Sequence, residues 1–309
     1  MNYTPLRIAT IRPEKTLTFD LFVLFKDQYL KYAERGKFLQ HEQVAKLRVQ
    51  KIARFFILSS DEEAYLKFFS EIMNEAMNCA KTGLDDKATI ISESVGTAVD
   101  LMREDPGSKN SYRLTQQAAH GLRAMINSNP EALKAIFGKV APTDDIIVKH
   151  SMNVAMLSTK MAELVKCSEA EIDNIATAAL IHDIGMFQLP GSGALFSKKQ
   201  TQLSPQEKVV YKSHIEKAVK LLEGKNYINP AIINLIMHHE EKLSGNGPLG
   251  FRKLGKLEEI LSMADCFDKK ITANKMTKNE AIKEFMLDEL GNYGLELMNA
   301  FKKMVRALD

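Results

Sequence analysis

The residues that could do chemistry gather in the second half of the chain, where histidines and carboxylates recur along the sequence. Neutral imidazole nitrogens and carboxylate oxygens both bind transition-metal ions, and one carboxylate can bridge two ions with its two oxygens. The pattern therefore predicts a metal centre. The histidines concerned are His150, His182, His214, His238 and His239, and the carboxylates near them are Asp183, Glu240, Asp265 and Asp268.

The adjacent pair of His182 and Asp183 is the centre of this series. The pair follows a run of apolar residues and comes just before Gly185, so we expect a buried helix that stops at the glycine. By itself the pair is ordinary, because a histidine and an aspartate at a helix end can satisfy each other by hydrogen bonding. Only the other histidines make it a candidate site.

Hydrophobic periodicity places each candidate ligand on a helix. His150, for example, shares the apolar face of its predicted helix with Val154 and Leu157. Residues that typically cap helices mark where these helices start. The predicted starts are Thr143 with Asp144 and Asp145, Ser168 with Glu171, Ser204 with Pro205 and Glu207, and Asn229 with Pro230, and a further helix is expected over residues 257–271.

The apolar faces of these helices would turn the ligands toward one interior. A buried polar group without a partner costs about 1–3 kcal/mol, so this many imidazoles and carboxylates need compensation. Bound metal ions would supply it, and helical bundles build di-metal sites from side chains on facing helices. We therefore interpret the series as a metal site and not as a chance distribution.

The first part of the chain has a different pattern. Residues 17–25 alternate with the period of a strand, which predicts a small mixed α/β domain for regulation or docking over residues 1–82. After that the pattern is helical, with a predicted capping start at Ser60 and helices over 86–103 and 111–127. We expect a mostly α protein, with a helical connection over 83–140 packed on the catalytic part and a helical metal-binding domain over 141–309. His41 and His120 stand alone in the sequence and are not expected to bind metal.

The composition argues against several classes of protein. The chain has 309 residues, of which 45% are hydrophobic, and a formal net charge of only +3, which is weak for a protein that binds nucleic acid polymers. Neither a membrane-length apolar run nor a signal-peptide start is visible, so we expect a cytoplasmic protein without membrane contact. Three separated cysteines, Cys79, Cys167 and Cys266, predict neither disulfides nor a cysteine zinc site.

The ordered histidine series also carries a family resemblance. From about residue 143 to about residue 280 the chain resembles the HD-GYP branch of the HD superfamily of metal-dependent phosphohydrolases. The flanking residues agree with the family pattern as well as the ligands do. The matching positions are His150, the pair His182 and Asp183 with Ile184 and Gly185 after it, Pro190, Leu203 and Ser204 before His214, the pair His238 and His239 with Glu240, and Asp265 with Asp268.

The resemblance implies a di-metal centre that hydrolyses cyclic di-GMP through a hydroxide bridging the metals, with Asp183 as the shared, catalytic ligand. It implies that iron is the metal, although the same ligand types suit manganese, zinc or nickel. One metal would be held by His150, His182, Asp183 and Asp265, and the other by Asp183, His214, His238 and His239.

Other residues are candidates for supporting roles. Asp268 and Glu240 are expected to orient the ligands. The glycine-rich segment over 244–255 is either a lid over the metals or a plain connection between helices. Candidate substrate contacts, for which solvated surface charge is the alternative explanation, are Lys269, Lys275, Arg252, Lys253, Gly245 and Gly247.

The chain departs from the family pattern at several places, including Ser244, which replaces the usual acidic residue before the first glycine. The tyrosine expected after the double histidine is missing, Met186 stands where a lysine is usual, and Ile146 stands where some members have a glutamate for a third metal. We therefore expect two metals and a weakened substrate site. Two hypotheses follow: a phosphodiesterase for cyclic di-GMP or a related nucleotide, and a weakly active or inactive domain that senses a cyclic dinucleotide or binds signalling proteins.

Overall fold

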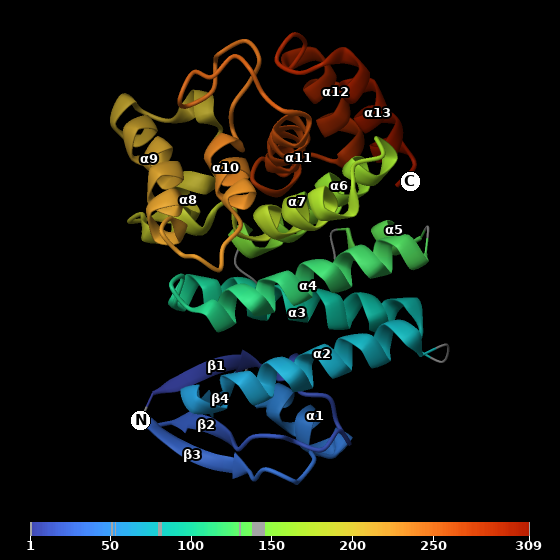
Figure 1. Cartoon of the computed structure of the whole chain (residues 1–309). Coiled ribbons are helices and arrows are strands. Elements are labelled where there is room, and N and C mark those ends of the chain that lie inside the picture. The colour runs from blue at the N-terminus through green and yellow to red at the C-terminus, as the bar shows by residue number, and fades with distance from the viewer. Residues whose placement is uncertain are drawn as a thin grey trace. The chain divides into compact units, whose positions relative to one another are not determined.

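The computed structural model describes residues 2–308 except 51, 53, 80, 81, 130 and 138–145. The chain divides into two compact units, Met1–Gly121 and Leu122–Asp309, with the division inside helix α4 (Lys109–Ser128). The predicted fold class, a mostly helical chain with a small mixed N-terminal part, is confirmed (Figure 1). The predicted domain boundaries after residues 82 and 140 stay predictions. The helix start expected at Thr143, Asp144 and Asp145 lies outside the described residues.

The first unit contains an antiparallel sheet whose four strands are in the order β1-β4-β2-β3. The predicted alternation over 17–25 forms a strand only from Leu21, and the turn to the next strand uses Lys26 and Asp27 in left-handed conformation, at φ 47° and 60°. The capping start predicted at Ser60 is wrong, because residues 59–61 form a 3-10 turn and the helix begins at Glu62. The elements of this unit are β1 (Tyr3–Arg7), β2 (Leu21–Phe25), β3 (Gln28–Ala33), α1 (His41–Val49), β4 (Arg54–Leu58), α2 (Glu62–Asn78) and α3 (Leu84–Glu104).

Apart from loops and one isolated bridge between Leu290 and Tyr293, the described part of the second unit is helical. Helix α6 packs against both α7 and α11, and α9 packs against a 3-10 helix, Ile184–Gln188, that follows α7. Most of the buried side chains at these contacts are apolar, and they form the core that holds the site. The helices are α5 (Ala132–Ile136), α6 (Ile146–Leu164), α7 (Glu169–Ile181), α8 (Ser192–Phe196), α9 (Pro205–Leu222), α10 (Pro230–His238), α11 (Lys256–Thr272), α12 (Lys278–Asp288) and α13 (Leu295–Arg306).

The predicted capping residues open three of these helices. Ser168 and Ser204 each accept the backbone N–H of the glutamate three residues later, and that glutamate accepts the serine N–H in return. The side chain of Asn229 accepts the N–H of Ala231 at the start of α10. These three starts are confirmed. They could be predicted because each capping residue and its partner lie within four consecutive residues.

Gly185 has a different role from the predicted helix stop. Helix α7 already ends at Ile181, and Gly185 lies inside the following 3-10 helix. A Cβ on Gly185 would lie 1.9 Å from the carbonyl oxygen of His214 and 2.7 Å from the backbone nitrogen of Ala218. The glycine is therefore needed because the backbone of α9 passes directly over it.

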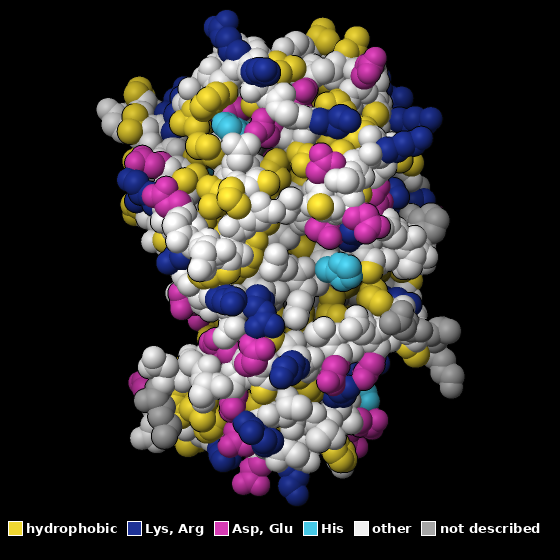
Figure 2. Space-filling view, in the orientation of Figure 1, with side chains coloured by type: hydrophobic (Ala, Val, Ile, Leu, Met, Phe, Trp, Pro, Cys, Tyr) yellow, Lys and Arg dark blue, Asp and Glu magenta, His cyan; other side chains and the backbone are white. Residues whose placement is uncertain are grey.

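The surface charge agrees with the composition. On the face shown in Figure 2, lysine and arginine side chains are interspersed with aspartate and glutamate side chains. Within the described ranges, no helix is both long enough and apolar enough to cross a membrane.

Candidate metal centre

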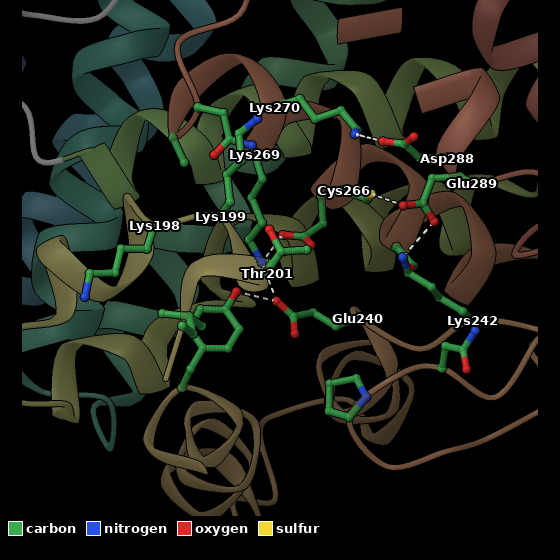
Figure 3. Close-up of a pocket in the computed structure, with 18 of the residues that line it drawn as sticks. Lys198, Lys199, Thr201, Glu240, Lys242, Cys266, Lys269, Lys270, Asp288 and Glu289 are labelled. Carbon is green, nitrogen blue, oxygen red and sulfur yellow. Dashed lines mark hydrogen bonds and ion pairs between the residues drawn. The ribbon is translucent and has the colours of Figure 1, made fainter. Parts of the chain in front are cut away.

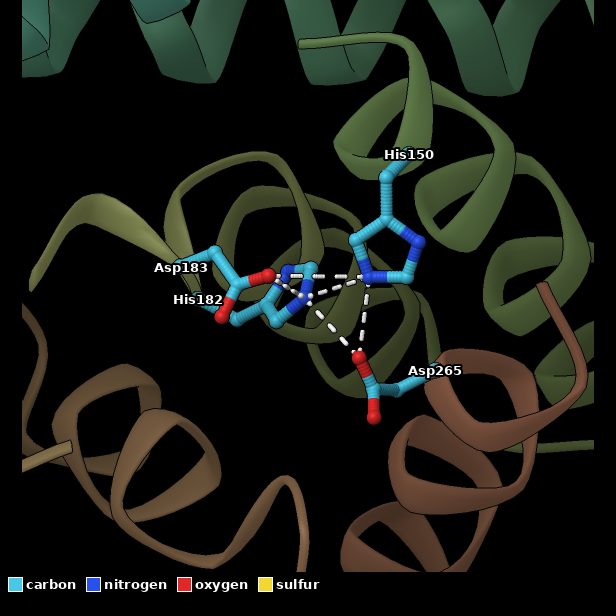
Figure 4. Close-up of side chains that lie close together, drawn as sticks. All are labelled: His150, His182, Asp183 and Asp265. Carbon is cyan, nitrogen blue, oxygen red and sulfur yellow. Dashed lines mark hydrogen bonds and ion pairs between the residues drawn. The ribbon is translucent and has the colours of Figure 1, made fainter. Parts of the chain in front are cut away.

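Three helices bring the first group of ligands together. His150 comes from the second turn of α6, His182 and Asp183 follow the end of α7, and Asp265 comes from α11 (Figure 4). One ligand atom from each of the four residues lies within 4.8 Å of all the others, and all four residues are buried. His150 Nε2 is 2.9 Å from Asp265 Oδ1, and His182 Nε2 is 3.3 Å from Asp183 Oδ2. These distances suit a single bound cation.

A second group shares Asp183 with the first. Its other members are His214 from α9 and His239 just after α10, and all three residues are buried. His214 Nε2 and His239 Nε2 lie 3.3 Å and 3.6 Å from Asp183 Oδ1, while Oδ2 of the same carboxylate faces the first group. The Asp183 carboxylate therefore lies between the two groups, where each of its oxygens could bind one cation.

Hydrogen bonds fix which ring nitrogen faces the centre. The Nδ1 atoms of His182, His214 and His239 lie 2.6 to 2.8 Å from the backbone oxygen three residues earlier in each case. A carbonyl oxygen can only accept, so each Nδ1 carries the proton and donates it. Each Nε2 is therefore the nitrogen that faces the centre, and once deprotonated its lone pair can bind a metal.

Without a cation, the close approach of these imidazole nitrogens and carboxylate oxygens is unfavourable. His214 Nε2 lies 3.2 Å from His239 Nε2, and two lone pairs at that distance repel unless a proton or a cation lies between them or beside them. Both carboxylate oxygens of Asp183 are buried and have no hydrogen-bond partner among the described residues. Such a carboxylate would cost several kcal/mol if it were left uncompensated. The donor set of imidazoles and carboxylates therefore fits divalent transition metals.

The electrostatics keep the carboxylates charged. Burial alone would raise the pKa of the Asp183 carboxyl, but His182 and Lys269 lower it well below its usual range. Burial likewise lowers the pKa of His182, whereas Asp183 and Asp265 raise it to about 10 in the absence of metal. Without metal, protons occupy the place of the cations, and a bound metal would displace them.

The two residues predicted to support the ligands lie next to them. Asp268 Oδ2 is 2.7 Å from His150 Nδ1, and its other oxygen accepts a hydrogen bond from Asn153. Glu240 accepts hydrogen bonds from the Tyr211 hydroxyl at 2.6 Å and from the Lys269 ammonium at 2.5 Å. Asp268 can thus orient a ligand directly, while Glu240 acts on the ligand set through Lys269.

His238 is the one predicted ligand that the structure does not bring into either group. Its Nδ1 lies 3.1 Å from Glu258 Oε1, and its ring packs edge-on against Phe251. Successive residues of a helix point about 100° apart, so His239 faces the centre while His238 faces the start of α11. His238 Nε2 is buried without a described partner.

A cavity of about 770 Å³ opens beside the first group (Figure 3). Asp265 and Lys269 lie in its wall, so it reaches a proposed metal ligand. Of the predicted substrate contacts, Lys269 lines this cavity, whereas Lys275, Arg252, Lys253, Gly245 and Gly247 are not among its lining residues.

Sequence reasoning missed several lining residues, and Tyr211 is the clearest case. It precedes His214 by three residues, hence one helical turn, and that spacing is the signal that could have placed it near the centre. Phe196 was missed as well, and its ring centroid lies 5.0 Å from that of His150.

The glycine-rich segment is held by one buried carboxylate. Glu241 accepts the backbone N–H groups of Leu249 and Phe251 at 2.6 Å and 2.7 Å. A Cβ on Gly247 would lie 2.6 Å from the Cα of Glu241, so the chain passes closely over this residue. The segment is thus an anchored loop in this structure.

Comparisons with known proteins agree with this geometry. The family model described as "HD domain" matches residues 122–294. The chain is 22% identical to the cyclic di-GMP phosphodiesterase PA4108 of Pseudomonas aeruginosa over 247 residues, which cover 76% of this chain and 55% of the relative. It is 28% identical to a cyclic di-GMP phosphodiesterase of Thermotoga maritima over 170 residues, which cover 52% of this chain and 45% of the relative. The chain thus spans about half the length of the curated relatives it matches.

A solved structure extends the similarity over both units. Bd1817, an HDG"Y"P protein from Bdellovibrio bacteriovorus, is 25% identical and superimposes with a TM-score of 0.76, covering 99% of this chain and 100% of that one. This match supports the HD-GYP branch that the sequence predicts. The family model matches more than half of the chain, and this chain therefore belongs to the HD domain family.

Proposed function

We propose that this chain is a metal-dependent phosphodiesterase that hydrolyses cyclic di-GMP or a related nucleotide. The single observation that carries the proposal is the buried Asp183 carboxylate, which faces two groups of ligands and has no hydrogen-bond partner among the described residues. Membership of the HD domain family and relatives named as cyclic di-GMP phosphodiesterases support the enzyme class and the substrate. A cytoplasmic location and signalling-protein partners are further parts of the proposal.

Two divalent ions would be held by the two groups of ligands. The first site would use His150, His182, Asp183 and Asp265, and the second Asp183, His214 and His239, with His238 able to join only if its ring leaves Glu258. We propose iron, and the same nitrogen and oxygen ligands also suit manganese, zinc and nickel. When bound, such ions polarise a phosphodiester and make water acidic enough to attack near pH 7.

The chain's own side chains would position the substrate. Lys269 Nζ lies 3.0 Å from Asp265 and lines the cavity, so it brings a positive charge to the place where a phosphate oxygen must approach the ligands. Glu240 accepts a hydrogen bond from this ammonium on the other side, and a second one from the Tyr211 hydroxyl. Asp268 keeps His150 in one orientation.

The test is turnover of cyclic di-GMP by protein loaded anaerobically with ferrous iron or with manganese, with metal content measured in parallel. Turnover that is lost together with metal in Asp183→Ala would support the enzyme. If the protein binds two metals and still does not consume cyclic di-GMP, the proposed activity is contradicted for this nucleotide.

A second candidate function is supported by the core around Met186. This residue is fully buried among apolar side chains such as Ile147 and Phe196, so no cation reaches the cavity from this position. A domain with a weakened substrate site could bind a cyclic dinucleotide and report it to a partner protein. Binding of cyclic di-GMP without hydrolysis in the same experiment would favour this sensor.

A further inference from the structure

The two walls of the cavity differ in how their lysines are paired. On the wall formed by α11, α12 and the segments next to them, each lysine has a carboxylate partner. Lys242 lies 2.7 Å from Glu289, and Lys270 lies 3.0 Å from Glu284. Charges paired in this way attract a further anion only weakly.

The opposite wall carries three lysines without an ion pair among the described residues, beside Lys198, which is paired with Glu207. Lys199 follows α8, and Lys208 and Lys212 lie on α9; all three line the cavity, are exposed, and take part in no ion pair that the structure describes. Lys208 and Lys212 are four residues apart, so they project from the same side of the helix. We call these three lysines the α9 rim.

Tyr211 connects this rim to the metal centre. It lies next to Lys212 on α9, it is buried, and its hydroxyl reaches Glu240 at the inner end of the cavity. The ammonium of Lys269 lies 5.6 Å from the centre of the Tyr211 ring and contacts Asp265. The cavity therefore has one positive charge at its inner end and a separate group of positive charges at its outer edge, with an aromatic ring between them.

We propose that the α9 rim binds the second phosphate of a cyclic dinucleotide whose first phosphate lies at the metal centre. This inference rests on the proposed function and narrows its substrate class to ligands with two phosphodiesters. The two phosphates of such a ligand lie on opposite sides of its ring, so they need two separate cationic positions. A cavity of about 770 Å³ falls within the range typical of small-molecule sites.

The test variant combines Lys199→Gln, Lys208→Gln and Lys212→Gln. A matched control combines Lys217→Gln, Lys220→Gln and Lys225→Gln, which remove the same charge from positions that do not line the cavity. Three exposed contacts should together change affinity by about tenfold. We expect the KM for cyclic di-GMP to rise by that factor in the test variant alone, while turnover of bis(4-nitrophenyl) phosphate, which has one phosphodiester, is unchanged.

Binding is measured as well as activity. Calorimetric titration of the metal-loaded protein with a non-hydrolysable phosphorothioate analogue of cyclic di-GMP should show the same loss of affinity, and 0.5 M salt should reduce the difference between parent and variant, because exposed charges are screened. If parent and test variant bind the dinucleotide with equal affinity and the small phosphodiester is still hydrolysed, the α9 rim does not bind the second phosphate. The proposed function would then still stand. A parent that neither binds the dinucleotide nor hydrolyses either substrate would instead overturn the proposed function.

Discussion

At the scale of the residue, the centre depends on how each imidazole is turned. His182, His214 and His239 all donate Nδ1–H to a carbonyl of their own helix, one turn earlier. This bond is local, and it turns Nε2 toward the interior before any metal is present. A preorganised ring loses less conformational entropy when a metal binds, which favours affinity.

Replacing Asp183 with asparagine should remove the shared ligand without changing its size. We expect the metal content to fall by at least half and phosphodiesterase activity to fall by about 100-fold or more, because a neutral amide binds transition metals poorly. Metal analysis and turnover of cyclic di-GMP measure the two effects. Asp173→Asn is the control, since Asp173 lies on α7, the helix just before Asp183, but forms only a half-exposed ion pair with Arg123. Full metal content in the Asp183 variant would contradict this assignment.

A weaker effect is expected at Asp268, which contacts a ligand and not the metal. Asp268→Asn should lower metal affinity by about 10- to 100-fold while the ligand set stays complete, because the His150 ring loses its charged acceptor. Competition with a chelator measures the affinity. Asp288→Asn, which changes an exposed partner of Lys270, should leave it unchanged. A similar affinity in both variants would argue against the supporting role.

Sequence alone predicted most of the residues that the structure brings together, because the spacing of His150, the His182 and Asp183 pair, and Asp265 is a property of the chain itself. It could not tell His238 from His239, since both are imidazoles at one helix end and only the packing of α10 decides which faces inward. Lys269 was predicted as a surface cation or a substrate contact, and its burial between Asp265 and Glu240 depends on tertiary packing.

At the scale of the element, the 3-10 helix after α7 packs directly against the backbone of α9 at Gly185. Gly185→Ala would place a methyl group 1.9 Å from the His214 carbonyl oxygen, so α9 must shift and carry His214 away from Asp183. We expect a loss of about 1–3 kcal/mol of unfolding free energy and a lower metal content. Thermal unfolding and metal analysis test this, with Gly193→Ala as the control, because a Cβ there meets nothing within 4 Å.

This contact also shows where prediction from sequence stops. The capping boxes at Ser168 and Ser204 were predictable because all their atoms come from one short segment. The 3-10 helix after α7 was not, because Gly185 is required by a neighbour about thirty residues later in the chain. A glycine after a helix fits a stop signal equally well until the neighbour is known.

The loop over residues 244–255 should depend on Glu241. Glu241→Ala removes the acceptor of two backbone N–H groups, and each bond to a buried charge contributes about 1.5–3 kcal/mol. We expect faster amide exchange at Leu249 and Phe251 and easier proteolysis within the loop, while metal content is unchanged. Hydrogen exchange measures the first effect. Unchanged protection would mean that other contacts hold the loop.

At the scale of the whole molecule, the chain consists of two units that differ in how fully their folds could be predicted from the sequence. The first unit was predicted to begin with a small mixed α/β domain, but the strand order β1-β4-β2-β3 of its sheet depends on pairings between distant segments that a single sequence does not show. The second unit was predicted more fully, because helices are set by local periodicity and caps. Its buried charges make its stability depend on metal and pH together.

The metal-free protein should become less stable as the pH rises. Although burial opposes it, nearby carboxylates raise the pKa of His150 and His214 above the usual 6.5 and that of His182 to about 10. These histidines hold protons more tightly when folded, so their contribution is complete below pH 6.5 and is lost as the pH rises toward 10. His239, whose pKa burial lowers, acts in the opposite sense and only below pH 6.5.

Metal should reverse this trend, because it binds the deprotonated rings. Between pH 6.5 and 9.5 we expect the Tm of the metal-free protein to fall, by roughly 2–4 °C for each kcal/mol lost, and the stabilisation by manganese to grow. Thermal unfolding at matched ionic strength, with and without manganese, measures both. His182→Gln should flatten the slope of the metal-free protein, because the group with the pKa near 10 is gone. A manganese effect that stays constant over this range would show that no protons leave the centre when metal binds.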